Sequence, residues 1–155
     1  MILKIDIKKL IVSILIPVVL GSIVGLITAP SGAYKELVQP SFAPPGFIFP
    51  IVWFILYTLM GVSSYIIMES NSYNKDSALL VYGIQLFVNL LWSIFFFKFN
   101  WYLFSFIWII LLIILVIIMI KKFYDISKLS GYLQIPYLIW LVFAAVLNFA
   151  IYILN

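Results

Sequence analysis

The chain has 155 residues, of which 66% are hydrophobic and only 9% charged, with a mean hydropathy of +1.26 and a formal net charge of +4. Soluble domains carry about 25% charged residues, so the composition excludes an ordinary water-soluble fold and leaves no room for a separate catalytic domain. The sequence contains neither Cys nor His, which excludes disulfides, thiol chemistry, zinc sites and axial His or Cys ligation of haem.

Hydropathy predicts five helices long enough to cross a bilayer, since one crossing takes about 20 mostly apolar residues. The first covers residues 10–28, and its length favours a retained helix over a cleaved signal peptide. A Pro-rich loop follows at 29–45, a polar hinge at 69–76, a tight turn at Asn100 and a basic linker at 121–130. The remaining spans are predicted at 46–68, 78–99, 103–120 and 133–154. We therefore expect a single all-α membrane domain over 1–155, built as a bundle of five transmembrane helices.

The lysines predict how this bundle is oriented. One side of the predicted membrane carries only Lys35 and Lys98. The other carries the remaining lysines, namely Lys4, Lys8, Lys9, Lys75, Lys121, Lys122 and Lys128. Under the positive-inside rule the N-terminus is cytoplasmic, and topology accounts for the basic charge without nucleic acid as a partner. The acidic residues all fall in loops or at span ends, which argues against a proton-coupled pump or a charged ion filter.

Three of the predicted spans carry aromatic and amide side chains along one helical face. These stripes, spaced at helical intervals, are Phe49, Trp53, Tyr57 and Gly61; Gln85, Asn89, Trp92 and Phe96; and Pro136, Trp140, Ala144 and Asn148. Indole and phenol walls with a few orienting amides are typical of a site for a flat, largely apolar ligand. The sequence therefore predicts a cavity between these three spans.

Other interpretations of these residues stay open. Asn89 and Asn148 could equally well bond across helices without touching a ligand. We expect Trp101, Tyr102 and Trp108 to be interfacial or packing residues. The fourth span has no polar stripe and is expected to face mainly lipid or a partner. The motif Gly21-x-x-x-Gly25, over residues 21–25, fits either a dimerisation face or close packing inside the bundle.

The segment leading into the second span reads PSFAPPGFIFPIVWFILYTLMG, residues 40–61. It closely resembles the signature of the TspO/MBR family, also called translocator proteins, tryptophan-rich sensory proteins or peripheral-type benzodiazepine receptors. The matching residues here are Pro40, Phe42, Pro44, Pro45, Phe49, Val52, Trp53, Leu56, Tyr57, Met60 and Gly61. The likeness continues through Gln85, Asn89, Trp92 and 95–96, and resumes at 136–138, Trp140, 143–144 and 147–148.

This resemblance implies a five-helix bundle, usually a homodimer, with a pocket beneath the long first loop. Family members bind porphyrins, sterols and isoquinoline or benzodiazepine-type drugs, and no obligatory cofactor is implied. The stripes and the resemblance together give a ligand site of Phe49, Trp53, Tyr57, Gln85, Asn89, Trp92, Trp140, Phe143, Ala144, Leu147 and Asn148, with a lid of Tyr34, Pro44 and Pro45. Some bacterial relatives are reported to degrade protoporphyrin in light. The tryptophans implicated there match Trp53 and Trp140, which would be the catalytic residues if this chain degrades porphyrin, and a bacterial cell membrane is the expected location.

The sequence departs from the family pattern in three places. It has Ala33 before Tyr34, where the family often has Trp, so the lid lacks one aromatic ring. Gln39 replaces the usual Lys before Pro40. No Lys or Arg follows Tyr152, so the C-terminal sterol-recognition pattern, itself a weak pattern, is incomplete.

Three functions follow from these observations. The first is a membrane receptor or transporter that binds tetrapyrroles for transport, sensing or homeostasis; without axial ligands, a free-base porphyrin suits the site better than iron-ligated haem. The second is an enzyme that degrades the bound porphyrin in light through the pocket tryptophans. The third is a scaffold or accessory subunit for other membrane proteins, which needs no pocket.

Overall fold

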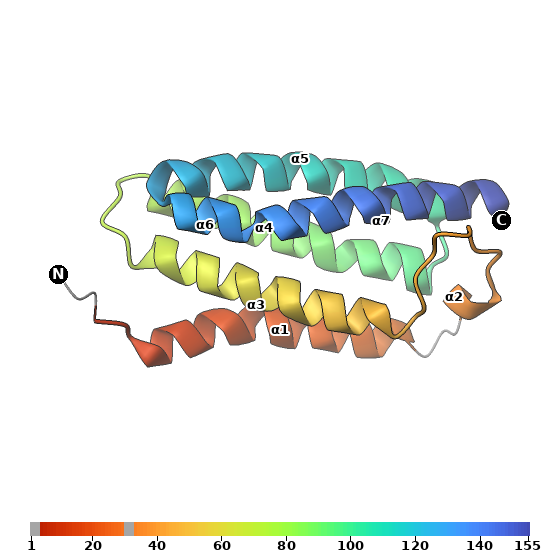
Figure 1. The fold of residues 1–155 in the computed structure, drawn as a ribbon, viewed down its shortest axis with the longest axis horizontal. Coiled ribbons are helices and arrows are strands. Elements are labelled where there is room, and N and C mark those ends of the chain that lie inside the picture. The colour runs from red at the N-terminus through yellow and green to blue at the C-terminus, as the bar shows by residue number, and fades with distance from the viewer. Residues whose placement is uncertain (1–3, 30–32) are drawn as a thin grey trace.

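A computed structural model describes residues 4–29 and 33–155, and every regular element within these ranges is helical. The elements are α1 (Ile7–Thr28), α2 (Ala33–Glu36), α3 (Ile48–Met68), α4 (Lys75–Ser93), the π-helix η2 (Ile94–Lys98), α5 (Tyr102–Ile126), α6 (Lys128–Leu133) and α7 (Ile135–Leu154). Among the described residues five helical stretches are long and apolar enough to cross a membrane, with η2 extending α4 and α6 preceding α7. The predicted all-α bundle of five transmembrane helices is confirmed. The start of α1 and the end of α7 lie at opposite ends of the bundle (Figure 1), as an odd number of crossings requires.

The fourth crossing is longer than the sequence predicts. α5 continues through Lys121 and Lys122 to Ile126, so the predicted linker at 121–130 was wrong. Charged side chains end a hydropathy segment without ending a helix, because a long Lys side chain at a span end reaches the interface. The helix stops where the backbone of Ser127 becomes extended (φ −146°, ψ 116°), and the Ser127 hydroxyl then accepts a hydrogen bond from Ser130 N at 3.4 Å to cap α6.

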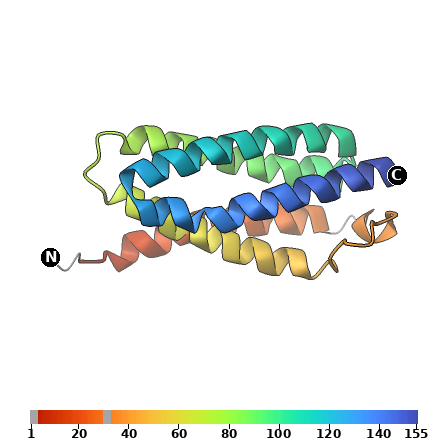
Figure 2. The ribbon, with the colours of Figure 1, turned by 45° about the horizontal axis from the view of Figure 1, so that its top comes forward.

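The core lies between α3, α4, α5 and α7, and α1 packs on the outside against α3 (Figures 1 and 2). α5 was expected to face mainly lipid, yet it packs on α4 and α7 with a row of fully buried side chains: Ile109, Leu112, Val116, Met119 and Phe123. The described span with the fewest buried side chains is α1. Sequence alone cannot separate these cases, because lipid and protein core are both apolar surroundings.

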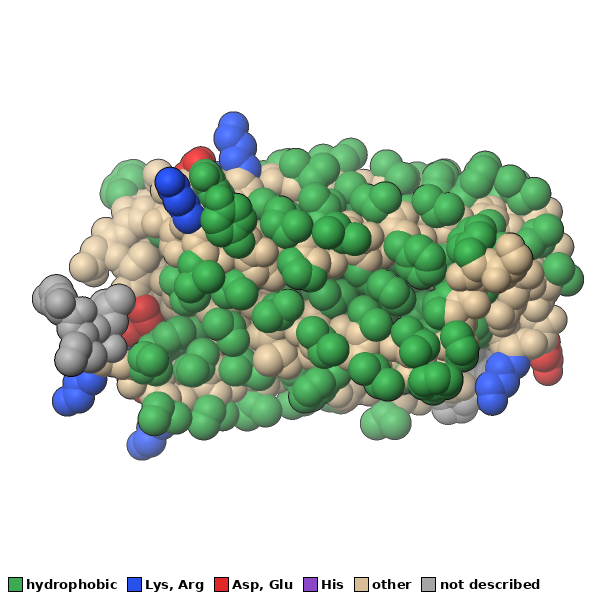
Figure 3. Space-filling view, in the orientation of Figure 1, with side chains coloured by type: hydrophobic (Ala, Val, Ile, Leu, Met, Phe, Trp, Pro, Cys, Tyr) green, Lys and Arg blue, Asp and Glu red, His purple; other side chains and the backbone are tan. Residues whose placement is uncertain are grey.

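The charged side chains gather at the two ends of the bundle, with hydrophobic side chains covering the length between them (Figure 3). The lysines at the starts of α1, α4 and α6 and at the end of α5 share one end, whereas Lys35 and Lys98 lie at the other. The fold therefore separates the lysines as the sequence suggests. Which end faces the cytoplasm stays a prediction.

A close backbone contact joins α1 to α3 at Gly61. A Cβ atom at this position would overlap the backbone of Ser13 and Ile14. Gly21 similarly gives room to the ring of Tyr57, whereas a Cβ at Gly25 would meet no atom within 4 Å. The first glycine of the Gly-x-x-x-Gly motif is thus used for packing inside the bundle.

Gly61→Ala is expected to lower stability by about 1–3 kcal/mol, because the added methyl forces α1 away from α3. Gly83 is the matched control, since a Cβ there meets nothing within 4 Å. Gly83→Ala should leave stability unchanged or raise it slightly, as alanine reduces the backbone freedom of the unfolded chain. Thermal unfolding in detergent measures both variants, and equal melting temperatures would contradict the close contact.

Candidate functional site

A small cavity lies between α3, α4, η2 and α7, under the loop that follows α1. It is lined by Tyr34, Phe49, Trp92, Phe96, Phe97, Ala144, Leu147 and Asn148. Six of these are predicted site or lid residues: Tyr34, Phe49, Trp92, Ala144, Leu147 and Asn148. The cavity volume is about 10 Å³, enough for about one water molecule, whereas small-molecule sites usually have about 300–1,000 Å³. The site is therefore closed in this structure.

Phe97 closes the cavity by placing its ring among the rings of four other residues, which lie on α2, α3, α4 and η2 itself. Its centroid lies 4.8 Å from Phe96, 6.0 Å from Trp92, 6.2 Å from Tyr34 and 6.4 Å from Phe49. All four contacts are edge-to-face, the arrangement that the aromatic quadrupole favours. The Phe97 ring thus fills the space between these four rings.

Amide hydrogen bonds fix the α4–α7 wall of the cavity. Trp92 Nε1 donates to Asn148 Oδ1 at 3.0 Å, and Asn148 Nδ2 donates to the carbonyl oxygen of Tyr102 at 2.8 Å. Asn148 thus links α4, α5 and α7 while lining the cavity. Asn148 therefore bonds across helices, as one interpretation of the sequence predicted, and also lines the cavity.

Three predicted ligand residues lie in a separate layer, away from the cavity lining. Tyr57 Oη donates to Asn89 Oδ1 at 2.9 Å, Asn89 Nδ2 donates to Tyr137 Oη at 2.7 Å, and Tyr137 Oη donates to Gln85 Oε1 at 2.8 Å. We call Tyr57, Gln85, Asn89 and Tyr137 the buried polar network. The members of this network form hydrogen bonds with one another and thereby hold α3, α4 and α7 together beside the cavity. None of them lines the cavity in this closed form.

Trp53 belongs to the wall that the network supports. Its indole stacks on Tyr57, with ring centroids 5.4 Å apart at 28°, and meets the edge of Tyr137 at 6.2 Å. It is half-buried and does not line the closed cavity. The phenols of the network therefore set the orientation of this tryptophan.

Trp140 and Phe143 stand beside the cavity on α7. The Trp140 ring meets Phe49 edge-to-face at 5.9 Å and Phe143 at 5.2 Å. Its indole N–H is buried and finds no acceptor among the residues that the structure describes. A buried donor without a partner costs about 1–3 kcal/mol of stability. An acceptor atom placed next to this N–H would remove that cost.

The loop covers the cavity through Tyr34 and Pro44. Tyr34 Oη donates to the carbonyl oxygen of Pro44 at 3.3 Å, and the Tyr34 ring meets Phe49 edge-to-face at 5.2 Å. Burial raises the pKa of the Tyr34 phenol above its usual value, so the hydroxyl keeps its proton and remains a donor near neutral pH. Pro45 is exposed, and its carbonyl oxygen accepts from Ile48 N at 3.0 Å in the turn into α3.

The end of α7 also holds the loop. Asn155 Oδ1 accepts a hydrogen bond from Val38 N at 3.0 Å, and Asn155 Nδ2 donates to Val38 O at 3.0 Å. Further along the loop, Phe42 meets the edge of Phe143 with centroids 6.3 Å apart. The loop is thus tied to α7 at two points.

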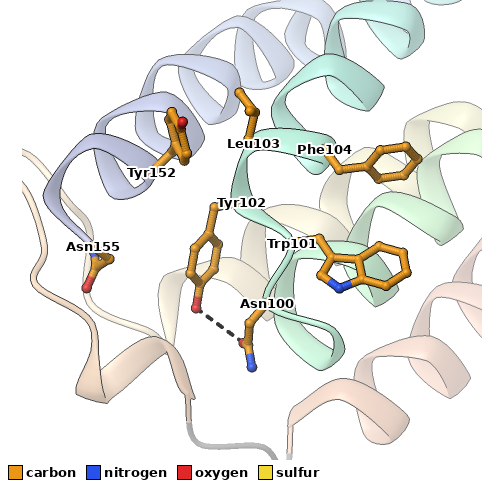
Figure 4. Close-up of a pocket in the computed structure, with 7 residues that line it drawn as sticks. All are labelled: Asn100, Trp101, Tyr102, Leu103, Phe104, Tyr152 and Asn155. Atoms are coloured by element: carbon orange, nitrogen blue, oxygen red, sulfur yellow. Dashed lines mark hydrogen bonds between the residues drawn. The ribbon is translucent and has the colours of Figure 1, made fainter.

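A larger depression of about 450 Å³ lies at the same end of the bundle but outside it, between the start of α5 and the end of α7 (Figure 4). It is lined by Asn100, Trp101, Tyr102, Leu103, Phe104, Tyr152 and Asn155. Trp101 is exposed and stacks on Phe95 with centroids 5.9 Å apart, while Trp108 Nε1 donates to Val88 O at 2.8 Å. Trp101 and Trp108 therefore pack against α4 and η2, in agreement with the packing role expected for them, whereas a position at the membrane interface stays a prediction.

Sequence reasoning missed two residues of this site. Phe97 escaped because η2 is a π-helix, with Phe99 N bonded to Ile94 O at 3.0 Å, and a helical stripe drawn at 3.6 residues per turn passes only through Phe96. The signal available in the sequence was the run of three phenylalanines at 95–97, shortly before Asn100. A π-helix itself often marks a functional site, but the sequence does not announce it. Tyr137 was not predicted as a site residue because it follows Pro136 by one position and so lies off the helical stripe that begins there.

Known proteins resemble this chain along most of its length. The profile of the TspO/MBR family matches residues 13–154. The tryptophan-rich protein TspO of Archaeoglobus fulgidus is 40% identical over 152 residues, which cover 97% of this chain and 99% of that protein. The tryptophan-rich protein TspO of Chlorobaculum tepidum is 37% identical over 79% of this chain and 78% of its own length, and the translocator protein of Sus scrofa is 30% identical over 77% and 72%. The chain is thus an integral, multi-pass membrane protein that belongs to the TspO/MBR family.

Proposed function

We propose that this protein binds a porphyrin in the aromatic cavity between α3, α4, η2 and α7, and that it serves tetrapyrrole transport, sensing or homeostasis in the membrane. A porphyrin is flat and largely apolar, with polar groups at its edge. Indole and phenyl faces suit the ring, and buried N–H donors suit the edge. Curated relatives carry the names tryptophan-rich sensory protein and translocator protein, which fit a receptor or transporter.

One observation supports this proposal above all. Aromatic rings from the loop, α3, η2 and α7 converge around a closed cavity of about 10 Å³, and the Trp140 N–H beside it has no partner among the described residues. Native proteins pair about 90% or more of their buried donors, so an unpaired N–H beside an aromatic cavity is a candidate contact for a ligand. A ligand with an acceptor atom at its edge gives that donor a partner once Phe97 has moved.

Binding is tested by thermal unfolding in detergent, in the dark, with protoporphyrin added. A ligand that binds only the folded protein raises the melting temperature progressively as its concentration rises above Kd, and a hundredfold excess over Kd adds about 2.7 kcal/mol of stability. An isoquinoline-type ligand is expected to compete for the same cavity. A melting temperature that no concentration of porphyrin changes would favour the scaffold or accessory-subunit function instead.

Trp140→Phe keeps an aromatic ring and removes the unpaired N–H. We expect it to weaken porphyrin binding by about tenfold, the equivalent of one buried hydrogen bond of about 1.4 kcal/mol. Trp101→Phe is the matched control, because Trp101 lies in the outer depression and should leave the affinity unchanged. If Trp101→Phe weakens binding and Trp140→Phe does not, the ligand occupies the depression.

Light-dependent degradation of the bound porphyrin is a second candidate. The observation in its favour is the stacked Trp53–Tyr57 pair, whose phenol is hydrogen-bonded into the buried polar network. Illumination of the porphyrin complex in air, followed by absorption spectra, compares the wild type with Trp53→Phe. Equal bleaching in both, or in empty micelles, would exclude a specific enzyme.

A further inference from the structure

Two residues deep in the bundle have polar atoms without partners. Gln134 is 0% exposed, and neither its amide nitrogen nor its amide oxygen has a hydrogen-bond partner among the described residues. Tyr82 is 9% exposed, and its hydroxyl likewise has no partner in that part of the chain. Each unmet group costs about 1–3 kcal/mol when it is buried, so such a group in a native interior calls for a physical explanation, for example an ordered water.

The helix register brings these two residues to the same level. α4 and α7 both run from the lysine-rich end towards the loop end (Figure 1). The Tyr137 hydroxyl on α7 donates to Gln85 on α4 at 2.8 Å. Gln134 and Tyr82 each lie three residues before one of these partners, which is about one helical turn. The register therefore puts Gln134 and Tyr82 at one level of the bundle, one turn below the contact between Tyr137 and Gln85.

The residues one turn further towards the lysine-rich end are small. Ala78 precedes Tyr82 by four residues and Ser130 precedes Gln134 by four, and both are 0% exposed. Residues four apart on one helix share a face, so Ala78 leaves more room beside Tyr82 than a large side chain would. Ser130 lies before the break between α6 and α7 at Gln134 and is hydrogen-bonded to Ser63 on α3.

We propose that an ordered water molecule binds between Tyr82 and Gln134 and continues the buried polar network towards the lysine-rich end. Buried waters typically make about three hydrogen bonds to polar groups that otherwise lack partners. The amide nitrogen donates to the water, while the water donates to the amide oxygen and accepts from the Tyr82 hydroxyl or donates to it. Neutral groups of this kind suit water rather than a metal ion, which would require carboxylate or other anionic ligands.

Ser64 offers the one competing explanation for Tyr82. Its hydroxyl lies near the Tyr82 phenol and itself donates to Gly61 O at 3.0 Å. Ser64 could accept a hydrogen bond from Tyr82, but that would leave both atoms of the Gln134 amide unmet. The two explanations therefore make opposite predictions at Gln134.

The direct test uses the intact protein in bilayers with nitrogen-15 in its glutamine side chains. The glutamines of the chain are Gln39, Gln85 and Gln134. Gln39 is exposed, whereas Gln85 is fully buried and bonded to Tyr137, so the two serve as wet and dry references. Solid-state NMR then measures magnetisation transfer from water to each amide. We expect transfer to Gln134 to approach that of Gln39 and to exceed that of Gln85 severalfold; a Gln134 signal as slow as that of Gln85 would overturn the proposal.

A double-mutant cycle gives an independent readout in detergent. With a bridging water, Tyr82→Phe and Gln134→Met each lower the melting temperature, and the double variant lowers it by less than the sum. If the groups are truly orphaned, Gln134→Met removes an unmet amide and raises the melting temperature, which contradicts the proposal. Ser64→Ala is the control: a loss equal to that of Tyr82→Phe, with Gln134→Met neutral or stabilising, would assign the Tyr82 hydroxyl to Ser64.

Discussion

Phe97→Ala is expected to weaken the fold and to speed porphyrin binding at the same time. The Phe97 ring fills the point where the loop, α3, α4 and η2 meet, and the cavity beside it has only about 10 Å³. Truncating a packed phenylalanine costs about 3 kcal/mol or more through lost contacts and the space left behind. The same space is what a ligand needs, so the variant no longer has to displace the ring before binding.

The measurement combines thermal unfolding with stopped-flow porphyrin binding in the dark. Apparent affinity is reduced by the fraction of molecules in a competent state, so a site that is already open should show a higher association rate and a lower Kd. Phe95→Ala is the matched control from the same π-helix, because Phe95 packs outside the cavity on Trp101, Phe104 and Trp108. It should lower stability without changing the association rate. If Phe97→Ala leaves the association rate unchanged and weakens the affinity, Phe97 contacts the bound ligand and does not block its entry.

Tyr137→Phe is expected to destabilise the bundle by about 1–3 kcal/mol. Tyr137 is 1% exposed, and its hydroxyl accepts from Asn89 and donates to Gln85. Removing the hydroxyl leaves one amide donor and one amide oxygen without partners in the interior. Cross-helix hydrogen bonds in membrane proteins contribute about 0.6 kcal/mol on average and about 1.7 at most, and the two unmet groups add their desolvation penalty.

Thermal unfolding of Tyr137→Phe, of Gln85→Met and of the double variant isolates this contribution. The double variant should lose less than the sum of the two single losses, because the second substitution removes a group that the first had already left unpaired. Tyr73→Phe is the control, since Tyr73 is 99% exposed and its hydroxyl can bond to water. Equal melting temperatures for Tyr137→Phe and Tyr73→Phe would show that the network does not hold the helices together.

Hydropathy was sufficient for the number of crossings, and helical spacing was sufficient for much of the site. The stripes on the second, third and fifth spans identified Phe49, Trp92, Ala144 and Asn148, which line one cavity in the fold. Asn100, expected at a tight turn, has a positive φ of 57°, a conformation that asparagine tolerates better than most residues. These features depend on local chemistry that a sequence expresses directly.

The remaining features depend on how helices pack, which a uniform period does not express. The π-turn at η2 shifts the register and brings Phe97 into the site. Helical spacing predicted that Gln85 lies on the same face as Trp92. It could not predict that the Tyr137 hydroxyl donates a hydrogen bond to the amide oxygen of Gln85. The placement of α5 in the core was also hidden, because an all-apolar helix looks the same against lipid and against protein.

The central claim is that the closed aromatic cavity is a ligand site, and a fluorescence titration tests it most directly. Protoporphyrin is added in the dark to the detergent-solubilised wild-type protein while tryptophan emission is followed. We expect quenching that saturates at one porphyrin per chain and that an isoquinoline-type ligand reverses. Quenching that rises linearly without saturation, and equals the quenching of free tryptophan in empty micelles, would contradict a specific site.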